Sequence, residues 1–280
     1  MTTIGPYTID PVPLYEQRGN KIFTTVDSSW IIKLTIPDEE PLDNIDELQN
    51  VLAIVSEPPR NCVVFPRSFS QLFGTTEEGV WYAMARYDGH VTMDSFCKSN
   101  WRRIGEAVLL FLEDLHHTHG LAHLDIKAEN VLFDRTSRQF YVADFELLMY
   151  PATNTGPLRE KMDDPHYFWY YLGFGAEPDE PFRSWRMDLV MLGYLLARLT
   201  WNPEYGWSAR EQLLAYASSR TQRMEEDTIA ALIEQRDQQL RSGAALSVIA
   251  YMNRVAAAVP WGLKTPPEKA LYRELRALFQ

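Results

Sequence analysis

The sequence predicts a mixed α+β protein in which a small, β-rich first part with one main helix precedes a larger, mostly α-helical second part. Two observations predict this division. Short apolar, β-branched runs recur between residues 21 and 85, with a single stretch of helical period among them. From residue 95 onward, apolar residues recur mainly at helical spacing, in several successive segments.

The first strands are expected after an extended lead-in. Residues 1–13 carry Pro6, Pro11 and Pro13 among mixed polar and apolar residues, which predicts an extended segment rather than a packed element. Residues 21–26 and 30–36 are apolar and β-branched, and a turn-forming Asp-Ser-Ser separates them. They predict a β-hairpin.

The rest of the first part contains one helix and two further strands. Residues 38–56 place apolar side chains at helical intervals, with acids near the start, where a helix favours them. Strands are expected at residues 62–65, which Pro66 closes, and at residues 80–85.

The second part begins with a helix from residue 95 that Gly120 ends. Two short strands are expected at residues 131–133 and 140–142, and the strongly apolar residues 187–199 predict a buried helix. Further helices are predicted at residues 209–217, 225–240, 244–259 and 267–278.

Composition limits the classes of function. The 280-residue chain is 46% hydrophobic, enough for a substantial core, and its formal net charge is -11. That charge repels phosphate backbones, so we expect no nucleic-acid partner and a preference for basic proteins or peptides. Two cysteines make no disulfide framework, and no apolar run approaches the ~18 residues of a membrane span. We therefore expect a soluble, cytoplasmic protein with no membrane partner.

One segment carries most of the chemical information. Residues 123–130 read His-Leu-Asp-Ile-Lys-Ala-Glu-Asn, and Asp-Phe-Glu follows at residues 144–146. Phosphoryl transfer needs such groups: magnesium ligands, a cation for the phosphates, and an acid against the attacking hydroxyl. The pattern resembles the catalytic loop and metal-binding motif of eukaryotic-type serine/threonine protein kinases. The resemblance extends from about residue 15 to residue 193.

This resemblance implies a bilobal protein kinase-like fold with ATP and Mg²⁺ as cofactors. Asp125 would orient the substrate hydroxyl and accept its proton, and Lys127 would lie beside the transferred phosphate. Asn130 and Asp144 match the two magnesium ligands of the family. The expected domain is a single kinase domain: after the lead-in, residues 14–84 form the N-lobe, 85–89 the hinge and 90–280 the C-lobe.

The resemblance also assigns nucleotide-binding residues in the N-lobe. Lys33 is the last residue of a Trp-Ile-Ile-Lys motif that is similar to the family's Val-Ala-Ile-Lys. It lies 125 − 33, or 92, residues before Asp125, which is close to the family interval. This lysine would bind the α- and β-phosphates and be held by a helix glutamate, for which Glu47 is the best match. Other acids compete for that role: Glu39, Glu40 and Asp46.

The hinge and the phosphate-covering loop are the remaining contacts. Backbone groups of Ala85 and Tyr87 would meet the adenine, with Met84 at the back of the nucleotide pocket. The family's loop has three glycines that let backbone amides approach the phosphates, whereas this chain offers only Gly19, with Lys21 as an additional charge.

Two residues are expected to brace the catalytic loop. Asp188 resembles the aspartate at the start of the family's buried helix, which accepts backbone hydrogen bonds from that loop. An unpaired carboxylate in so apolar a run would be costly, which also predicts specific partners. His123 is expected to be a buried bracing residue, and the histidines at 116, 117 and 119 are too densely spaced for a metal site.

Two further departures affect function. Glu146 replaces the glycine of the family's Asp-Phe-Gly, adding an acid near Asp125 and Asp144. Leu124 replaces the arginine that normally pairs with a phosphorylated activation segment, so we expect activity without phosphorylation of residues 144–177.

Lys127 favours Ser/Thr phosphorylation of protein substrates as the function. The first alternative is a small-molecule kinase of the aminoglycoside or choline phosphotransferase type, which shares the Asp-x-Glu pattern. Against it, 188 − 144 leaves 44 residues, room for a peptide-binding segment. The second alternative is a catalytically weak pseudokinase scaffold, motivated by the glycine-poor loop and Glu146. The physiological substrate and the oligomeric state stay open.

Overall fold

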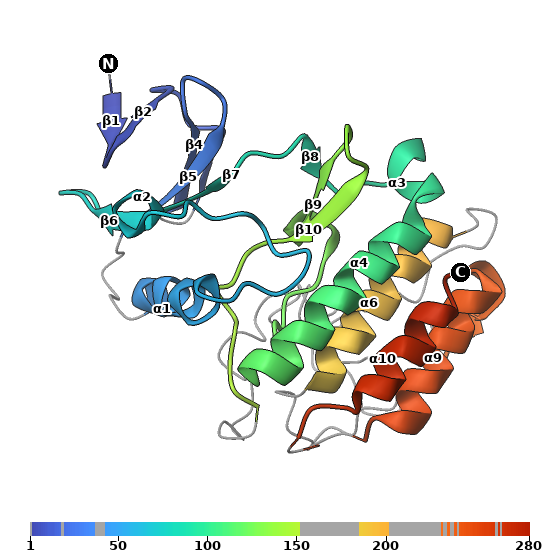
Figure 1. Cartoon of the computed structure of the whole chain (residues 1–280). Coiled ribbons are helices and arrows are strands. Elements are labelled where there is room, and N and C mark those ends of the chain that lie inside the picture. Colours follow the sequence, from blue (N-terminus) through green and yellow to red (C-terminus); the bar gives the residue numbers. More distant parts are fainter. Residues whose placement is uncertain are drawn as a thin grey trace.

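The computed structural model of the chain describes residues 2–17, 20–36, 43–151, 185–201, 241–260 and 265–280, with isolated residues at 231, 234–235, 238–239 and 263. These residues form a mixed α+β fold, which confirms the predicted class. An antiparallel sheet lies at one end and a group of long helices at the other (Figure 1). No helix within the described ranges is both long and apolar enough to cross a membrane.

The larger sheet contains five antiparallel strands. In spatial order they are β3 (Tyr15–Gln17), β4 (Asn20–Thr24), β5 (Trp30–Thr35), β7 (Val80–Ala85) and β6 (Phe73–Thr75). Strands β4 and β5 confirm the predicted hairpin, and β7 confirms the strand expected at 80–85. In the hairpin turn, the Asp27 carboxylate accepts the Ser29 amide at 3.1 Å, and Ser28 adopts a left-handed φ of 59°.

The N-terminus is packed, so the expectation of an extended lead-in is wrong. Residues 2–9 form a hairpin of β1 (Thr2–Ile4) and β2 (Tyr7–Ile9). Ile4 and Ile9 are buried in a cluster with Trp81 of the larger sheet. Gly5 makes the turn with a φ of 54°, and a Cβ there would lie 2.1 Å from the Trp81 ring. Strands of three residues are too short to show an alternating pattern.

One helix accompanies the larger sheet, as predicted. Helix α1 (Asp43–Val55) lies within the expected range 38–56, of which residues 38–42 are outside the described part. The short helix α2 (Phe69–Leu72) was not expected. The strand predicted at 62–65 is wrong, because this segment makes only one isolated parallel bridge, from Cys62 to Val142. It instead passes from α1 to the sheet as a linker (residues 57–64).

The second part combines a small sheet with long helices. The small sheet has the order β10 (Gln139–Val142), β9 (Val131–Asp134) and β8 (Gly89–His90), and β9 and β10 confirm the two predicted strands. The helices are α3 (Ser95–Ser99), α4 (Trp101–Asp114), α6 (Trp185–Thr200), α9 (Leu246–Ala258) and α10 (Lys269–Ala277).

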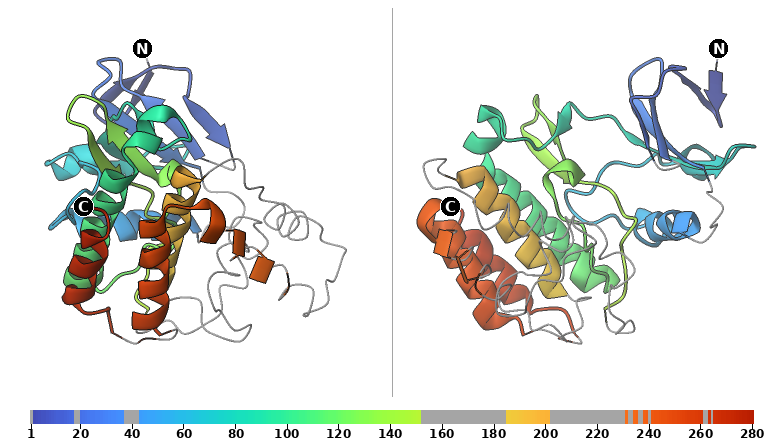
Figure 2. Two further views of the ribbon diagram at one scale, coloured as in Figure 1. Left: turned by 90° about the vertical axis from the view of Figure 1, so that its right-hand side faces the viewer. Right: turned by 180° about the vertical axis from the view of Figure 1, so that it is seen from behind.

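The long helices pack side by side around α6, as Figure 2 shows from two further directions. Nearly every residue of α6 is buried, which confirms the expected core helix. Gly120, with a φ of 68°, ends the helical turn that follows α4, as predicted. The helix expected at 209–217 lies outside the described residues, and the one at 225–240 is described only at scattered positions.

Candidate active site

A cavity of about 330 Å³ lies between the larger sheet and β9. Its apolar walls come from opposite sides, with Ile22 and Ile31 on the sheet and Leu132 on β9. Lys33, Asn130 and Asp144 also line it and contribute polar groups. An apolar slot with a few convergent polar groups is typical of a cofactor site.

Lys33 and Asp144 meet inside this cavity. Lys33 on β5 places its ammonium Nζ 3.7 Å from Oδ1 of Asp144, which follows β10. Asp144 adopts a left-handed φ of 68°, which is uncommon for a non-glycine residue. Burial alone would raise the pKa of Asp144, but the ammonium groups of Lys33 and Lys127 more than offset it, so the pKa is lowered. The carboxylate is therefore anionic at neutral pH.

Asp125 is held by two neighbours from its own loop. Its Oδ2 accepts from Nζ of Lys127 and from Nδ2 of Asn130, both at 2.7 Å. Asn130 Nδ2 also donates to the Asp125 carbonyl at 3.0 Å. Asp125 is buried, and this burial raises its pKa while Lys127 partly offsets the rise. The structure therefore brings Asp125, Lys127 and Asn130 into direct contact.

The site has the oxygen donors that a magnesium ion prefers. Oδ1 of Asp144 is buried and has no hydrogen-bond partner among the described residues, only the ammonium of Lys33 at 3.7 Å. Nδ2 of Asn130 faces two acceptor oxygens, which fixes the amide orientation and leaves its Oδ1 on the other side. A carboxylate and an amide oxygen on one cavity fit this ion, so Asn130 and Asp144 are the residues that would hold it.

The candidate catalytic loop (residues 123–130) is braced by Asp188 of α6. The Asp188 carboxylate is fully buried and accepts the amides of His123 at 2.8 Å and Leu124 at 2.6 Å. His123 is also buried and contacts the Ala143 carbonyl through Nε2 at 3.2 Å, and burial lowers its pKa. Both expected bracing roles are therefore confirmed.

The segment after β10 is fixed by contacts that the sequence did not reveal. Phe145 is fully buried and packs between the rings of His123 and Phe65, with centroids 5.8 Å and 5.9 Å away. Asn50 of α1 donates through Nδ2 to the Phe145 carbonyl at 2.8 Å. Helix α1 is therefore bonded to the segment that carries Asp144. No sequence motif indicates this role of Asn50.

The expected hinge residues Ala85 and Tyr87 line the cavity, but the backbone amide of Ala85 is bonded to the linker. The Arg86 amide donates to the Ser29 carbonyl at 3.1 Å, so in the antiparallel pattern the preceding residue, Ala85, turns its amide and carbonyl away from β5. The Ala85 amide then donates to the Val64 carbonyl at 2.8 Å. Both Ala85 and Tyr87 line the cavity, where the sequence predicts the adenine.

The Tyr87 side chain has a structural role that the sequence did not indicate. Its hydroxyl accepts the Val64 amide at 2.9 Å, and its ring packs on that of Tyr141 at 4.7 Å between centroids. Burial raises the pKa of this phenol, so it stays protonated. The hinge is thereby fastened to the linker and to β10.

Other predicted site residues are not positioned. Gly19 lies outside the described residues, and for Glu47 the backbone belongs to α1 while its side chain is not described. Glu146 is exposed, next to the buried Phe145. Two residues that the sequence did not single out, His90 and Glu129, also line the cavity.

A scan against models of known protein families and a search of curated proteins found no match to this chain.

Proposed function

We propose that this chain is an ATP- and Mg²⁺-dependent phosphotransferase with a bilobal protein kinase-like fold, acting on Ser and Thr hydroxyls of protein substrates. The observation that carries the proposal is the 3.7 Å approach of Lys33 to Asp144 in a cavity that Asn130 also lines. Asp125 is held against that Asn130 at 2.7 Å. A cation, two metal-ligand candidates and a base thus converge from separate parts of the chain, as phosphoryl transfer requires.

The nucleotide would bind with its adenine between the apolar walls and its phosphates beside Lys33, Asn130 and Asp144. Ile22 and Leu132 would enclose the base, and the carbonyl of Ala85 and the backbone of Tyr87 would hydrogen-bond its edge, since the Ala85 amide is bonded to Val64. Lys33 would neutralise phosphate oxygens while Asn130 and Asp144 hold the magnesium ion. That ion would supply charge neutralisation on the β- and γ-phosphates.

The transfer step follows from the contacts of Asp125. A substrate hydroxyl oxygen would attack the γ-phosphorus, its proton would pass to Asp125, and the bond from phosphorus to the bridging oxygen would break to release ADP. Lys127 lies 2.7 Å from Asp125, where its positive charge would stabilise the charge on the transferred phosphoryl group. Burial lowers the pKa of Lys127, but Asp125 together with the nearby Asp144 and Glu129 raises it by more, so the side chain remains a cation.

The chain's acidity supports a basic protein as the substrate, because its formal net charge of -11 attracts positively charged partners. The same negative charge disfavours a polyanionic substrate.

Radiolabelled ATP with magnesium tests the function directly. The acceptors would be a basic test protein, a panel of aminoglycosides and choline, with Asp125→Asn as the inactive variant. Asp10→Asn serves as control, because Asp10 is exposed and only accepts the Val12 amide. We expect label on the protein, lost in Asp125→Asn and kept in Asp10→Asn. Label on small molecules alone would favour the aminoglycoside or choline type. No transfer, together with no magnesium-dependent nucleotide affinity, would favour a scaffold.

A further inference from the structure

The C-terminal helix α10 is connected to the candidate active site by two chains of polar side chains. It lies beside α4 and α9 (Figure 1). Tyr272 and Arg276 are four residues apart and so share one face of this helix. Each of them begins one of the two chains.

The first chain runs from Tyr272 to the catalytic loop. The Tyr272 hydroxyl is hydrogen-bonded to Nδ1 of His116, whose Nε2 lies 2.8 Å from Oδ2 of Asp188. All three side chains are fully buried. Asp188 in turn accepts the amides of the first two loop residues, as described above. Because an ionised carboxylate only accepts, Nε2 of His116 carries a proton. Tyr272 keeps its own proton, since burial raises its pKa.

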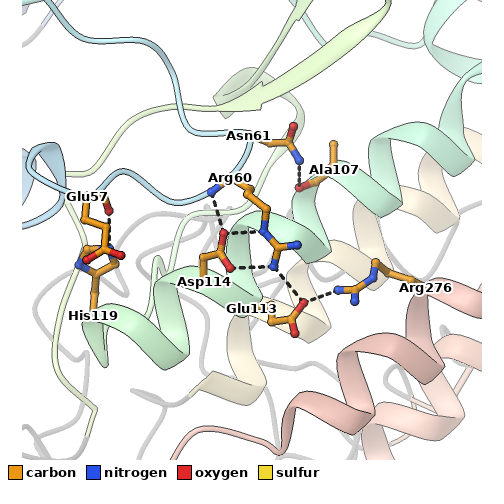
Figure 3. Close-up of polar contacts among 8 residues, drawn as sticks. All are labelled: Glu57, Arg60, Asn61, Ala107, Glu113, Asp114, His119 and Arg276. Atoms are coloured by element: carbon orange, nitrogen blue, oxygen red, sulfur yellow. Dashed lines mark hydrogen bonds and ion pairs between the residues drawn. The ribbon is translucent and has the colours of Figure 1, made fainter. Parts of the chain in front are cut away.

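The second chain runs from Arg276 to the linker (Figure 3). Nη1 of Arg276 lies 2.6 Å from Oε2 of Glu113, a largely buried carboxylate on α4, and Nη2 of Arg60 lies 3.2 Å from the same oxygen. Arg60 also makes a fork with Asp114, through Nε and Nη2 at 2.7 Å each, and its backbone amide donates to Asp114 at 2.9 Å. Bidentate pairs of this kind fix geometry as well as charge.

The linker passes this connection to the strand that carries Asp144. Next to Arg60, Asn61 donates through Nδ2 to the Ala107 carbonyl at 3.2 Å, and its own carbonyl accepts the Val142 amide at 2.7 Å. The Val63 amide donates to the Val142 carbonyl at 3.1 Å. Val142 is two residues before Asp144, so a shift of the linker would move the metal-ligand candidate.

We propose that Tyr272 and Arg276 are positioning residues for phosphoryl transfer, which fix the backbones that carry Asp125 and Asp144. One chain ends on the amide of Leu124, adjacent to Asp125, and the other ends two residues from Asp144. This inference rests on the proposed function for its effect on rate. Its structural content, the restraint of two backbone segments by α10, is independent of any activity.

The test compares variants on a single helix. Tyr272→Phe removes the hydroxyl and Arg276→Gln removes the charge. Glu274→Gln is the matched control, because Glu274 also makes an ion pair, with Arg254 at 2.7 Å, but both partners are about half exposed and neither is bonded to the two chains. For each protein, kcat and the KM for ATP are measured below the melting transition. Amide hydrogen exchange is followed at residues 121–125 and 142–144.

In Tyr272→Phe and Arg276→Gln we expect kcat to fall about tenfold, with a smaller change in KM, because misplaced supporting groups reduce the rate of a positioned reaction. Exchange should become about tenfold faster at residues 121–125 in the first variant and at 142–144 in the second. Arg276→Lys should recover part of the loss, and Glu274→Gln should match the wild type.

Two results would overturn the inference. One is exchange in both variants equal to that of Glu274→Gln at the two segments. The other is faster exchange spread evenly over all helices with a lower melting temperature, since that would show general destabilisation. If the wild type transfers no phosphate, the proposed function fails, while the exchange data still decide whether α10 restrains these segments.

Discussion

The side-chain amide of Asn50 donates to the carbonyl of Phe145 at 2.8 Å and to that of Glu146 at 3.3 Å. Asn50 is 95 positions from Phe145 and 96 from Glu146 in the sequence, yet the two bonds join α1 directly to the segment after Asp144. Because Phe145 is also buried between two rings, the position of α1 and that of Asp144 are coupled. A change in one element therefore reaches the other.

Asn50→Ala should lower kcat about tenfold, because α1 loses its bond to this segment and Asp144 is held less firmly. The cost in unfolding free energy should be about 1 kcal/mol, that of one net hydrogen bond. Gln49→Ala is the control, because Gln49 is exposed on the same helix. Equal kcat values for the two variants, measured with saturating ATP, would argue against the coupling.

Lys33→Met should reduce phosphoryl transfer by about a hundredfold or more, because it removes the cation that we propose neutralises the phosphate oxygens. The same change raises the pKa of Asp144, which Lys33 helps to lower. Lys98→Met, an exposed lysine on α3, is the control. Steady-state rates and calorimetry of magnesium-nucleotide binding check the effect, and unchanged binding together with an unchanged rate would contradict the assignment.

The ion pair between Lys33 and Asp144 also predicts a pH-dependent stability. A carboxyl with a lowered pKa in the fold contributes stability above its ordinary pKa, and this contribution is lost as the pH falls through the lowered value. The melting temperature of Lys33→Met should therefore differ from that of the wild type most at neutral pH. The difference should shrink on acidification.

The activity should fall on the acid side at a higher pH than an ordinary aspartate would give, because burial raises the pKa of Asp125. In Lys127→Met this acid limb should move to still higher pH, since burial persists while the ammonium that lowers the pKa is lost. The dependence of kcat on pH for both proteins measures the shift. A limb that moves to lower pH would show that Asp125 is not the group being titrated.

The active protein should need no phosphorylation. Leu124 occupies the position next to Asp125, is almost fully buried and has a φ of 61°. It offers no cation to a phosphate group, so a phosphorylated segment would find no partner there. Treatment with a protein phosphatase should leave kcat unchanged, and mass spectrometry would verify the removal of phosphate. A large loss of activity would show that another residue takes the arginine's place.

The internal contacts of the candidate catalytic loop could be predicted from sequence because they are local. Asp125, Lys127 and Asn130 lie within six residues, so their spacing alone brings them together. The buried carboxylate of Asp188 was also predictable, because an acid within an apolar helix needs partners. Helix α4, which has one clear apolar face, and helix α6, which is apolar along nearly its whole length, were predictable from local pattern as well.

Contacts between distant segments were not predictable. Arg60 and Asp114 are 54 residues apart, and nothing near either residue indicates the other. The apolar run at 62–65 has the composition of a strand, but its backbone bonds go to Val142 on one side and to the hinge on the other. Such a use of backbone groups depends on the tertiary structure, which the pattern of a single segment does not contain.

Tyr87→Phe tests whether the hinge is fastened by its side chain. Removal of the hydroxyl deletes the hydrogen bond to the Val64 amide. Because Val64 is exposed, water can replace the acceptor, so the cost should be about 0.5 to 1.5 kcal/mol of unfolding free energy. Because Ala85 and Tyr87 line the cavity, a looser hinge should also raise the KM for ATP more than it lowers kcat.

Tyr141→Phe is the matched control, since Tyr141 stacks on Tyr87 but its hydroxyl bonds only to the exposed Gln139 side chain, at 2.9 Å. Denaturant unfolding and nucleotide titration of both variants separate the two effects. If both variants lose equal stability, the stacked rings and not the bond to Val64 fasten the hinge. If Tyr87→Phe loses stability but binds nucleotide as the wild type does, the hinge backbone keeps its position without this bond.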